Sequence, residues 1–372
     1  MSSNRKAPPV SFDIGVTVNR FGRPALDCQF AIPKLLGTTA SLTADASISS
    51  LVAHAFNLGY QLPLSRDGWR FTAEAIKQVN DFQYSSSFSE HVTGFGFGWL
   101  YKSNHRIGLD AHMRDIHPLI TLEGGPKFVA SEQVRRVPLR TIKTSVNYKY
   151  TRDKIVKRSD TNAHPIGGDR FIFACDISGL FGDVKMAKME SSYQVHRRFW
   201  KDFVLHTRIG SGAIAQLGGR PMPTPIQDRF FLGGTTDEAS SFRGFALRSM
   251  GPCGRRILTT GSQIKKGDKV YDHIGGDAYW SIDNAVSFPI YSSADSLDVR
   301  GFVFAQIGSL IPTLRAVGDF KRNVRASVGA GITVPVGGMG TMELSIGKPV
   351  YGSQPSDTQQ LLQIGIRLSN KI

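Results

Sequence analysis

The stretch Asn323-Val-Arg-Ala-Ser-Val-Gly-Ala-Gly-Ile-Thr-Val-Pro-Val336 decides the fold class. Its even positions are valine, alanine or isoleucine, and its odd positions are polar residues, glycine or proline. A period of two is typical of a β-strand with one apolar face. Residues 51–64, 341–347 and 362–369 repeat this alternation, and no segment sustains a helical period of comparable quality. The sequence therefore predicts an all-β fold.

Two architectures fit this alternation, and they differ in where the apolar face points. A soluble sandwich turns it inward and needs large side chains to fill the space between two sheets. A membrane barrel turns it outward to lipid and tolerates small and polar residues in its lumen. In residues 94–99, glycine alternates with phenylalanine or tryptophan. Glycine suits an inner wall that something approaches closely, so the pattern favours the barrel and leaves the sandwich as an alternative.

Counting the alternating segments predicts sixteen antiparallel transmembrane strands, which suits a closed barrel with both chain ends on one side. The long connections near 117–137, 218–277 and 311–322 all follow odd-numbered strands, so they share one face. We expect a short N-terminal segment over 1–10, a barrel over 11–372 and a long loop over about 218–277. The expected strands are 11–19, 24–33, 39–49, 51–64, 70–80, 88–102, 104–116, 138–152, 168–179, 184–197, 203–217, 278–290, 297–310, 323–336, 340–350 and 360–370.

Composition narrows the class of protein further. The 372 residues carry a formal net charge of +15, which favours an anionic partner or a membrane surface. We expect membrane lipids and no nucleic acid. No stretch approaches the roughly 18 apolar residues of a membrane-spanning helix, and the N-terminus lacks the apolar core of a secretory signal. The three cysteines lack metal-ligand spacing, and no catalytic constellation emerges, so we expect no enzyme, metal or cofactor.

The long segment 218–277 carries the most specific motifs. Asp228-Arg-Phe-Phe-Leu-Gly-Gly234 precedes Ser241-Phe-Arg-Gly-Phe245. An aromatic pair, a double glycine and an Arg-Gly-aromatic tip in this order resemble the signature loop of the outer-membrane barrel-assembly superfamily, to which bacterial and organellar β-barrel insertases belong. In that superfamily the loop folds back into the lumen between the eleventh and twelfth strands. The residues that carry the resemblance are Asp228, Arg229, Phe230, Gly233, Gly234, Arg243, Gly244 and Phe245.

The resemblance in sequence motifs extends over about 218–372. Over 1–217 the chain resembles the superfamily only in its architecture. Residues 275–280 (GGDAYW), 303–308 (VFAQIG) and 363–368 (QIGIRL) follow the superfamily's order. The match is most similar to the central barrel subunit of the mitochondrial sorting and assembly machinery. It implies an insertase in the mitochondrial outer membrane that receives β-barrel precursors, releases them into membrane lipids and works with accessory subunits.

Three features depart from the superfamily's pattern. No POTRA module lies within this chain, although such soluble modules usually precede the barrel. Bacterial members commonly carry an acidic residue on the inner wall of the thirteenth strand, where this sequence has Gln306. The last strand usually ends on alternating hydrophobic residues, and here the final position is Asn370.

The superfamily's logic implies a seam between the first and last strands. Unpaired backbone groups in hydrocarbon cost several kcal/mol each, so an edge exposed by a weak seam can pair with the last strand of a client. The alternative is an ordinary strand pair that never opens. The seam residues are Phe12, Ile14, Val16, Val18, Gln363, Gly365, Ile366 and Leu368.

Arg243, at the tip of the loop, is expected to grip the inner wall. A buried arginine needs partners, and Gln306, Asp283 and Glu343 lie on the inward parity of nearby strands. The sequence does not choose among these three. The alternative reading makes Arg243 one of many solvated basic residues.

Two other functions remain open at this point. A passive outer-membrane pore with a basic lumen would prefer anions, but a simple pore does not need the motifs of the long loop. A plastid or bacterial relative of the same superfamily shares those motifs. The missing secretory signal disfavours the bacterial location.

Overall fold

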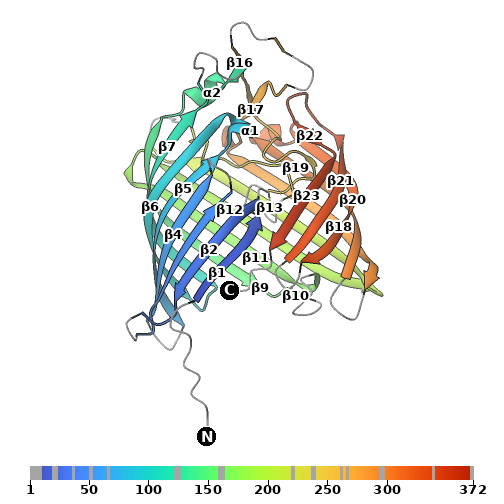
Figure 1. Ribbon diagram of the computed structural model, residues 1–372. Coiled ribbons are helices and arrows are strands. Elements are labelled where there is room, and N and C mark those ends of the chain that lie inside the picture. Colours follow the sequence, from blue (N-terminus) through green and yellow to red (C-terminus); the bar gives the residue numbers. More distant parts are fainter. Residues whose placement is uncertain are drawn as a thin grey trace.

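The computed structural model (Figure 1) describes residues 11–18, 24–35, 38–49, 53–64, 68–120, 127–157, 164–218, 223–235, 240–259, 263–264, 268–292, 298–336 and 340–368. Side chains are described in these ranges except at 11–18, 24–27, 292, 317, 336, 340 and 366–368.

One antiparallel sheet forms most of the molecule and curls into a barrel (Figure 1). It has 17 strands, and one of them, β10 (Val156–Lys157), is a two-residue pairing against β11. The other sixteen pair in chain order, which confirms the predicted strands. Their bounds are β1 Ser11–Val18, β2 Pro24–Ile32, β3 Ser41–Ile48, β4 His54–Pro63, β5 Trp69–Asp81, β6 Phe88–Tyr101, β7 His105–Pro118, β9 Arg140–Asp153, β11 Pro165–Gly182, β12 Met186–Trp200, β13 Phe203–Gln216, β18 Ala278–Ser292, β19 Asp298–Ile311, β20 Val324–Val336, β21 Gly340–Tyr351 and β23 Leu362–Leu368.

The alternation of apolar and polar residues places the apolar face on the outside. On β21, Glu343 and Ser345 are 1% exposed, whereas Met342 and Leu344 are 41% and 38% exposed. Large apolar side chains on the outer surface and buried polar ones on the inner wall belong to a membrane barrel. The sandwich alternative is therefore wrong.

The glycines of β6 make room for side chains of the neighbouring strands. A Cβ atom at Gly94 would lie 2.2 Å from Cδ2 of His112 on β7. At Gly96 it would lie 2.4 Å from Oδ1 of Asp110, also on β7. What approaches this part of the inner wall is thus its own neighbours in the sheet.

The barrel is not closed, which corrects the expectation of a sealed barrel. β1 pairs with β2, and β23 pairs with β21, but no ladder joins β1 to β23 among the described residues. Figure 1 shows these two edge strands, blue and red, facing each other. Because the strand number is even, β1 begins and β23 ends on the same face of the barrel.

Short elements cap the face opposite the chain ends. They are α1 (Gln83–Ser86), β8 (Phe128–Val129), α2 (Glu132–Arg135), β15 (Cys253–Arg255), β16 (Ile257–Leu258), β17 (Tyr271–His273), η2 (Leu314–Phe320) and β22 (Gln359–Gln360). The two-residue strand β14 (Gly244–Phe245) pairs with β22 and lies inside the barrel. In the described part of the chain, every helix is too short and too polar to cross a membrane.

The described parts of residues 218–277 are called the lumen loop from here on, and the stretches 223–235 and 240–250 fold against the inner wall. One buried cluster joins Leu232, Phe242 and Met250 of the loop to Ile214 of β13 and Leu310 of β19. A second cluster packs the loop residues Ile226 and Phe231 against elements of the cap. The core of the protein therefore lies inside the barrel, where the loop supplies apolar surface that the polar inner wall lacks.

Candidate functional site

The tip of the lumen loop touches the inner wall backbone to backbone. Gly244 has a φ of +88°, and the Cβ of any other residue there would lie 3.3 Å from the backbone carbon of Gly347 on β21. Gly347 is equally restricted, because its Cβ would lie 3.0 Å from the nitrogen of Gly244. This close approach places the preceding residue, Arg243, against the wall.

Arg243 is 2% exposed and is held by two carboxylates. Its Nε donates to Oε1 of Glu343 at 2.5 Å, and its Nη2 donates to Oε2 at 3.0 Å. Its Nη1 donates to Oδ2 of Asp283 on β18 at 3.0 Å. Bidentate pairs of this kind are the strongest hydrogen bonds of arginine. Burial alone would lower the pKa of Arg243, but the charges of Glu343 and Asp283 outweigh it and raise the pKa.

Gln306 on β19 binds the backbone of Arg243 and not its guanidinium. The Arg243 N–H donates to Oε1 of Gln306 at 2.6 Å. Thus the three residues singled out from the sequence all contact Arg243, and the two carboxylates supply the negative charge that a glutamine cannot. We call Arg243, Glu343, Asp283 and Gln306 the tip anchor.

The lumen loop is also tied to the edge strand β23. The side-chain amide of Gln363 accepts from the Gly244 N–H at 2.9 Å and donates to the Phe245 carbonyl oxygen at 2.7 Å. Thr235 Oγ1 donates to the backbone oxygen of Ile364 at 3.2 Å. A Cβ at Gly365 would lie 2.9 Å from Thr235. The loop therefore braces the last strand from inside the barrel.

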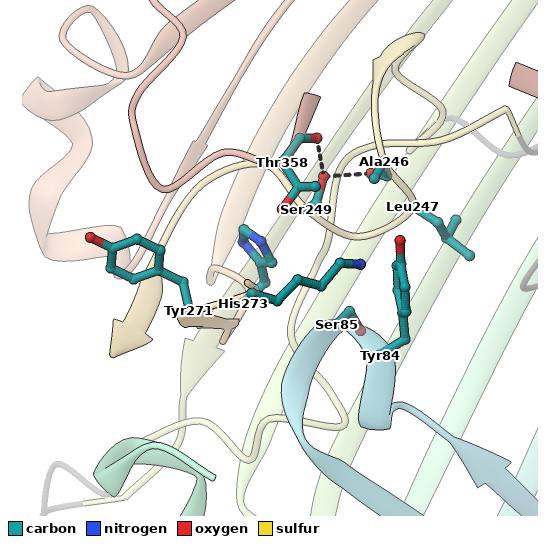
Figure 2. Close-up of a pocket in the computed structure, with 9 residues that line it drawn as sticks. Tyr84, Ser85, Ala246, Leu247, Ser249, Tyr271, His273 and Thr358 are labelled. Carbon is teal, nitrogen blue, oxygen red and sulfur yellow. Dashed lines mark hydrogen bonds between the residues drawn. The ribbon is translucent and has the colours of Figure 1, made fainter. Parts of the chain in front are cut away.

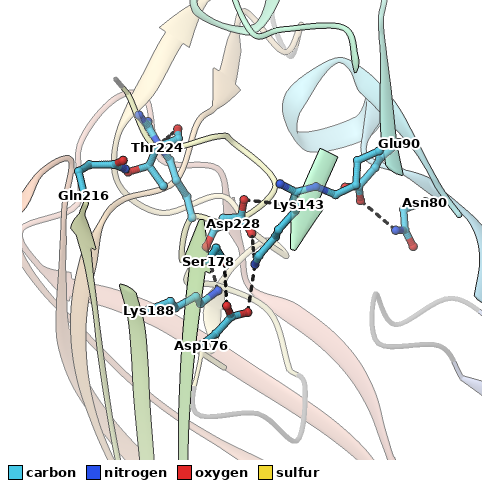
Figure 3. Close-up of polar contacts among 11 residues, drawn as sticks. Asn80, Glu90, Lys143, Asp176, Ser178, Lys188, Gln216, Thr224 and Asp228 are labelled. Carbon is cyan, nitrogen blue, oxygen red and sulfur yellow. Dashed lines mark hydrogen bonds and ion pairs between the residues drawn. The ribbon is translucent and has the colours of Figure 1, made fainter. Parts of the chain in front are cut away.

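Asp228 attaches the loop to the opposite wall, where Figure 3 shows it among basic side chains. Its carboxylate accepts from Arg114 of β7 at 2.9 Å and from Lys143 of β9 at 2.9 Å. Its backbone oxygen accepts from Lys188 of β12 at 2.8 Å. Burial would raise the pKa of Asp228, but Arg114 and Lys143 outweigh it and hold the pKa below the ordinary value. We call Asp228, Arg114, Lys143 and Lys188 the base anchor.

The remaining motif residues shape the loop. Phe230 packs on Tyr279 of β18 with ring centroids 4.8 Å apart. Gly233 and Gly234 have φ angles of +123° and +84°, which side chains rarely adopt. The Phe245 oxygen accepts from the Gly234 N–H at 3.0 Å, which folds the loop back on itself. Arg229 belongs to neither anchor, because its Nε donates to the Thr224 oxygen at 3.1 Å.

The first strand can be placed only by its backbone. Phe12, Ile14, Val16 and Val18 lie on β1 in register with Phe30, Cys28, Leu26 and Pro24 of β2. Their side chains, and those of Ile366 and Leu368 on β23, lie outside the described part of the structure, as does Asn370.

Sequence reasoning missed the cations of the base anchor and the ion pairs of the cap. Arg256 Nε donates to Asp272 at 2.7 Å, and Arg325 Nε donates to Asp357 at 3.2 Å. The inward parity of Lys143 and Arg325 could have marked them as lumen residues. Nothing in a single sequence pairs them with particular carboxylates, since many inward positions carry charge.

A small polar pocket lies between α1, β17 and residues 246–249 of the lumen loop (Figure 2). Ser249 borders it and donates through Oγ to the backbone oxygens of Ala246 and Thr358 at 2.7 and 2.9 Å. His273 lines the same pocket and is 3% exposed. Burial lowers the pKa of His273 to about 4, so the imidazole is neutral near pH 7.

These features define a membrane β-barrel with an in-folded loop. The chain belongs to the Omp85 superfamily, whose domain matches residues 34–369. Proteins of this superfamily act in β-barrel assembly or transport at outer membranes, which gives the general class of function. No curated protein matches the sequence.

Solved structures agree with this fold. The chain is similar to BamA from Haemophilus ducreyi lacking POTRA domains 1-3, with a TM-score of 0.76 and 18% identity over 96% of this chain and 70% of that one. It is also similar to CdiB from Escherichia coli (TM-score 0.50, 14% identity, 96% of this chain and 62% of that one). CdiB from Acinetobacter baumannii gives a TM-score of 0.51 and 11% identity over 97% of this chain and 59% of that one. At these identities the likeness concerns the fold alone.

Proposed function

We propose that this chain is an insertase that folds β-barrel precursors into the mitochondrial outer membrane, through the seam between β1 and β23. One observation carries the proposal: the barrel is not closed at this seam, while the lumen loop holds the β23 side through Gln363 and Thr235. The assignment to mitochondria rests on the resemblance of the loop motifs to the sorting and assembly machinery.

The physics of strand edges explains how such a seam could work. Backbone N–H and C=O groups left unpaired in hydrocarbon cost several kcal/mol each. A β-strand of a client that pairs with β1 removes this cost through backbone bonds that do not depend on client sequence. Because the loop holds β23, the client strand can add to β1 while the opposite edge of the seam stays in place. The protein acts in this scheme by binding and needs no covalent chemistry, metal or cofactor.

The bound loop argues against a passive anion-preferring pore. It fills part of the lumen with a buried apolar cluster, and its residues Arg243 and Asp228 are paired with charged groups of the walls. A pore gains nothing from this arrangement. In planar bilayers we expect small and unsteady conductance, whereas a stable, open, anion-selective conductance would favour the pore.

The proposal is tested by reconstituting the chain into liposomes and adding an unfolded mitochondrial β-barrel precursor. We expect the precursor to become protease-resistant and heat-modifiable in electrophoresis faster than in liposomes with a heat-denatured control. Equal rates would overturn the insertase function. Fractionation of cells that express the tagged chain tests the location, and recovery in plastids or in a bacterial envelope would contradict the mitochondrial assignment.

A further inference from the structure

The lipid-facing surface of β4 to β9 has two polar borders of different chemistry. On β6, His91 and Tyr101 point outward ten residues apart, and exposed Phe95 lies between them. Ten residues of a tilted strand span about 25 Å, the usual height of the apolar band of such a barrel. The border near the chain ends is aromatic, with Trp69 packed on Tyr101 at 4.8 Å. The other border carries histidine side chains.

The second border is a row of residues that lie opposite one another on the neighbouring strands β4 to β9, and several of them are histidines. The register joins His54 to Val79, Val79 to His91, His91 to Asp115, and Asp115 to Arg140. His117 of β7 lies against His91 with ring centroids 4.5 Å apart, and Lys77 of β5 is the next outward residue below Val79. We call the exposed basic residues His54, Lys77, His91, His117 and Arg140 the histidine rim.

The three histidines determine the charge of this border. Lys77 and Arg140 are offset by the carboxylates Asp81 and Asp115 near the same border, and Arg140 Nε donates to Asp115 at 2.7 Å. The groups that face His91 are Lys77 of β5, His54 of β4, and Asp115 and His117 of β7. An imidazole gains a proton, and with it a positive charge, in mild acid. The rim therefore becomes more positively charged as pH falls.

We propose that the histidine rim binds the headgroups of anionic phospholipids in the leaflet on the cap side, and that this binding strengthens as pH falls. Three observations favour lipid over a soluble protein partner. The rim faces outward, it continues directly into the apolar band, and its separation from the aromatic border along β6 matches the usual height of that band. The proposal does not depend on the insertase function.

The test measures lipid selectivity with the intact protein in phosphatidylcholine vesicles. Spin-labelled phosphatidylglycerol and spin-labelled phosphatidylcholine are compared, because phosphatidylglycerol keeps its single charge throughout this range. Electron paramagnetic resonance gives the relative association of each lipid with the protein at about pH 8 and about pH 5.5. We expect phosphatidylglycerol selectivity to rise about threefold or more in acid, since each basic residue near the surface contributes roughly a factor of five.

Two variants separate the rim from other effects. The triple variant His54→Asn, His91→Asn and His117→Asn should lose the acid-induced rise. The matched control, His112→Asn, changes an inward-facing residue of β7 and should keep it. Heat-modified mobility checks that both variants fold. A wild-type protein without the acid-induced rise, or a triple variant that retains it, would overturn the proposal.

Discussion

The two anchors of the lumen loop use opposite charges. At the tip anchor the loop supplies the cation, Arg243, and the wall supplies the carboxylates Glu343 and Asp283. At the base anchor the loop supplies the carboxylate, Asp228, and the wall supplies Arg114 and Lys143. The loop therefore ties the β7–β12 wall to the β18–β23 wall, and only the tip anchor lies beside the seam. This difference separates a role in client insertion from a role in general stability.

The largest effect is expected at the tip anchor. Arg243→Ala leaves Glu343 and Asp283 buried without their cation, so the free energy of unfolding should fall by about 3–5 kcal/mol. Client insertion should fall as well, because the loop no longer fixes the strands beside the seam. Urea unfolding and precursor insertion in liposomes measure the two effects. Arg243→Lys keeps the charge but not the bidentate pair. Its free energy of unfolding and its client insertion should lie between those of Arg243→Ala and of the wild type. Normal client insertion by a folded Arg243→Ala protein would refute the role of the tip anchor.

Acid should act on the cap before it acts on the base anchor. The pKa of folded His273 is about 4, whereas that of an unfolded histidine is about 6.5. The unfolded chain thus takes up a proton first, and stability is lost as pH falls between these values, by up to about 3 kcal/mol. The pKa of Asp228 is lowered, so its contribution is lost only below about pH 4. Urea unfolding from about pH 7 to pH 4 should show a smaller loss in His273→Gln. An identical pH dependence in the two proteins would contradict the buried neutral histidine.

The base anchor should show a smaller effect that spares insertion. Asp228→Asn keeps an oxygen that can accept one hydrogen bond, and Lys143 retains Asp176 at 3.1 Å. We expect the free energy of unfolding to fall by about 1–3 kcal/mol, with client insertion near the wild-type rate after correction for folded protein. If Asp228→Asn impairs insertion as strongly as Arg243→Ala, the two anchors do not differ in function.

The smallest expected effect concerns the brace on β23. Thr235→Val keeps the side-chain volume but loses the hydrogen bond from Oγ1 to the Ile364 oxygen. One lost hydrogen bond should cost about 1 kcal/mol. Hydrogen exchange of the β23 amides should then speed up more than that of the β12 amides. Unchanged exchange in β23 would mean that the loop does not brace this strand.

The sequence predicted the strands better than the contacts between them. A period of two reports which face of a strand is apolar, and this property is local, so all sixteen strands could be located. The partners of Arg243 could also be narrowed to Gln306, Asp283 and Glu343. These three residues have the inward-facing parity of their strands, and the loop motif indicates that Arg243 lies inside the barrel. The base anchor could not be narrowed in this way, since the path of residues 223–235 across the lumen decides which inward cations meet Asp228. The unclosed seam depends on the curvature of the whole sheet, which no segment encodes alone.

The most direct test of lateral insertion is a reversible lock across the seam. Cysteines are placed at Val16 and Ile366, and at neighbouring offsets, after replacement of Cys28, Cys175 and Cys253. A matched pair at Leu58 and Ala75, which are in register on β4 and β5, locks a continuous part of the sheet. We predict that oxidation of the seam pair stops client insertion, that reduction restores it, and that the matched pair has no such effect. Insertion at the normal rate through a verified seam crosslink would contradict the account.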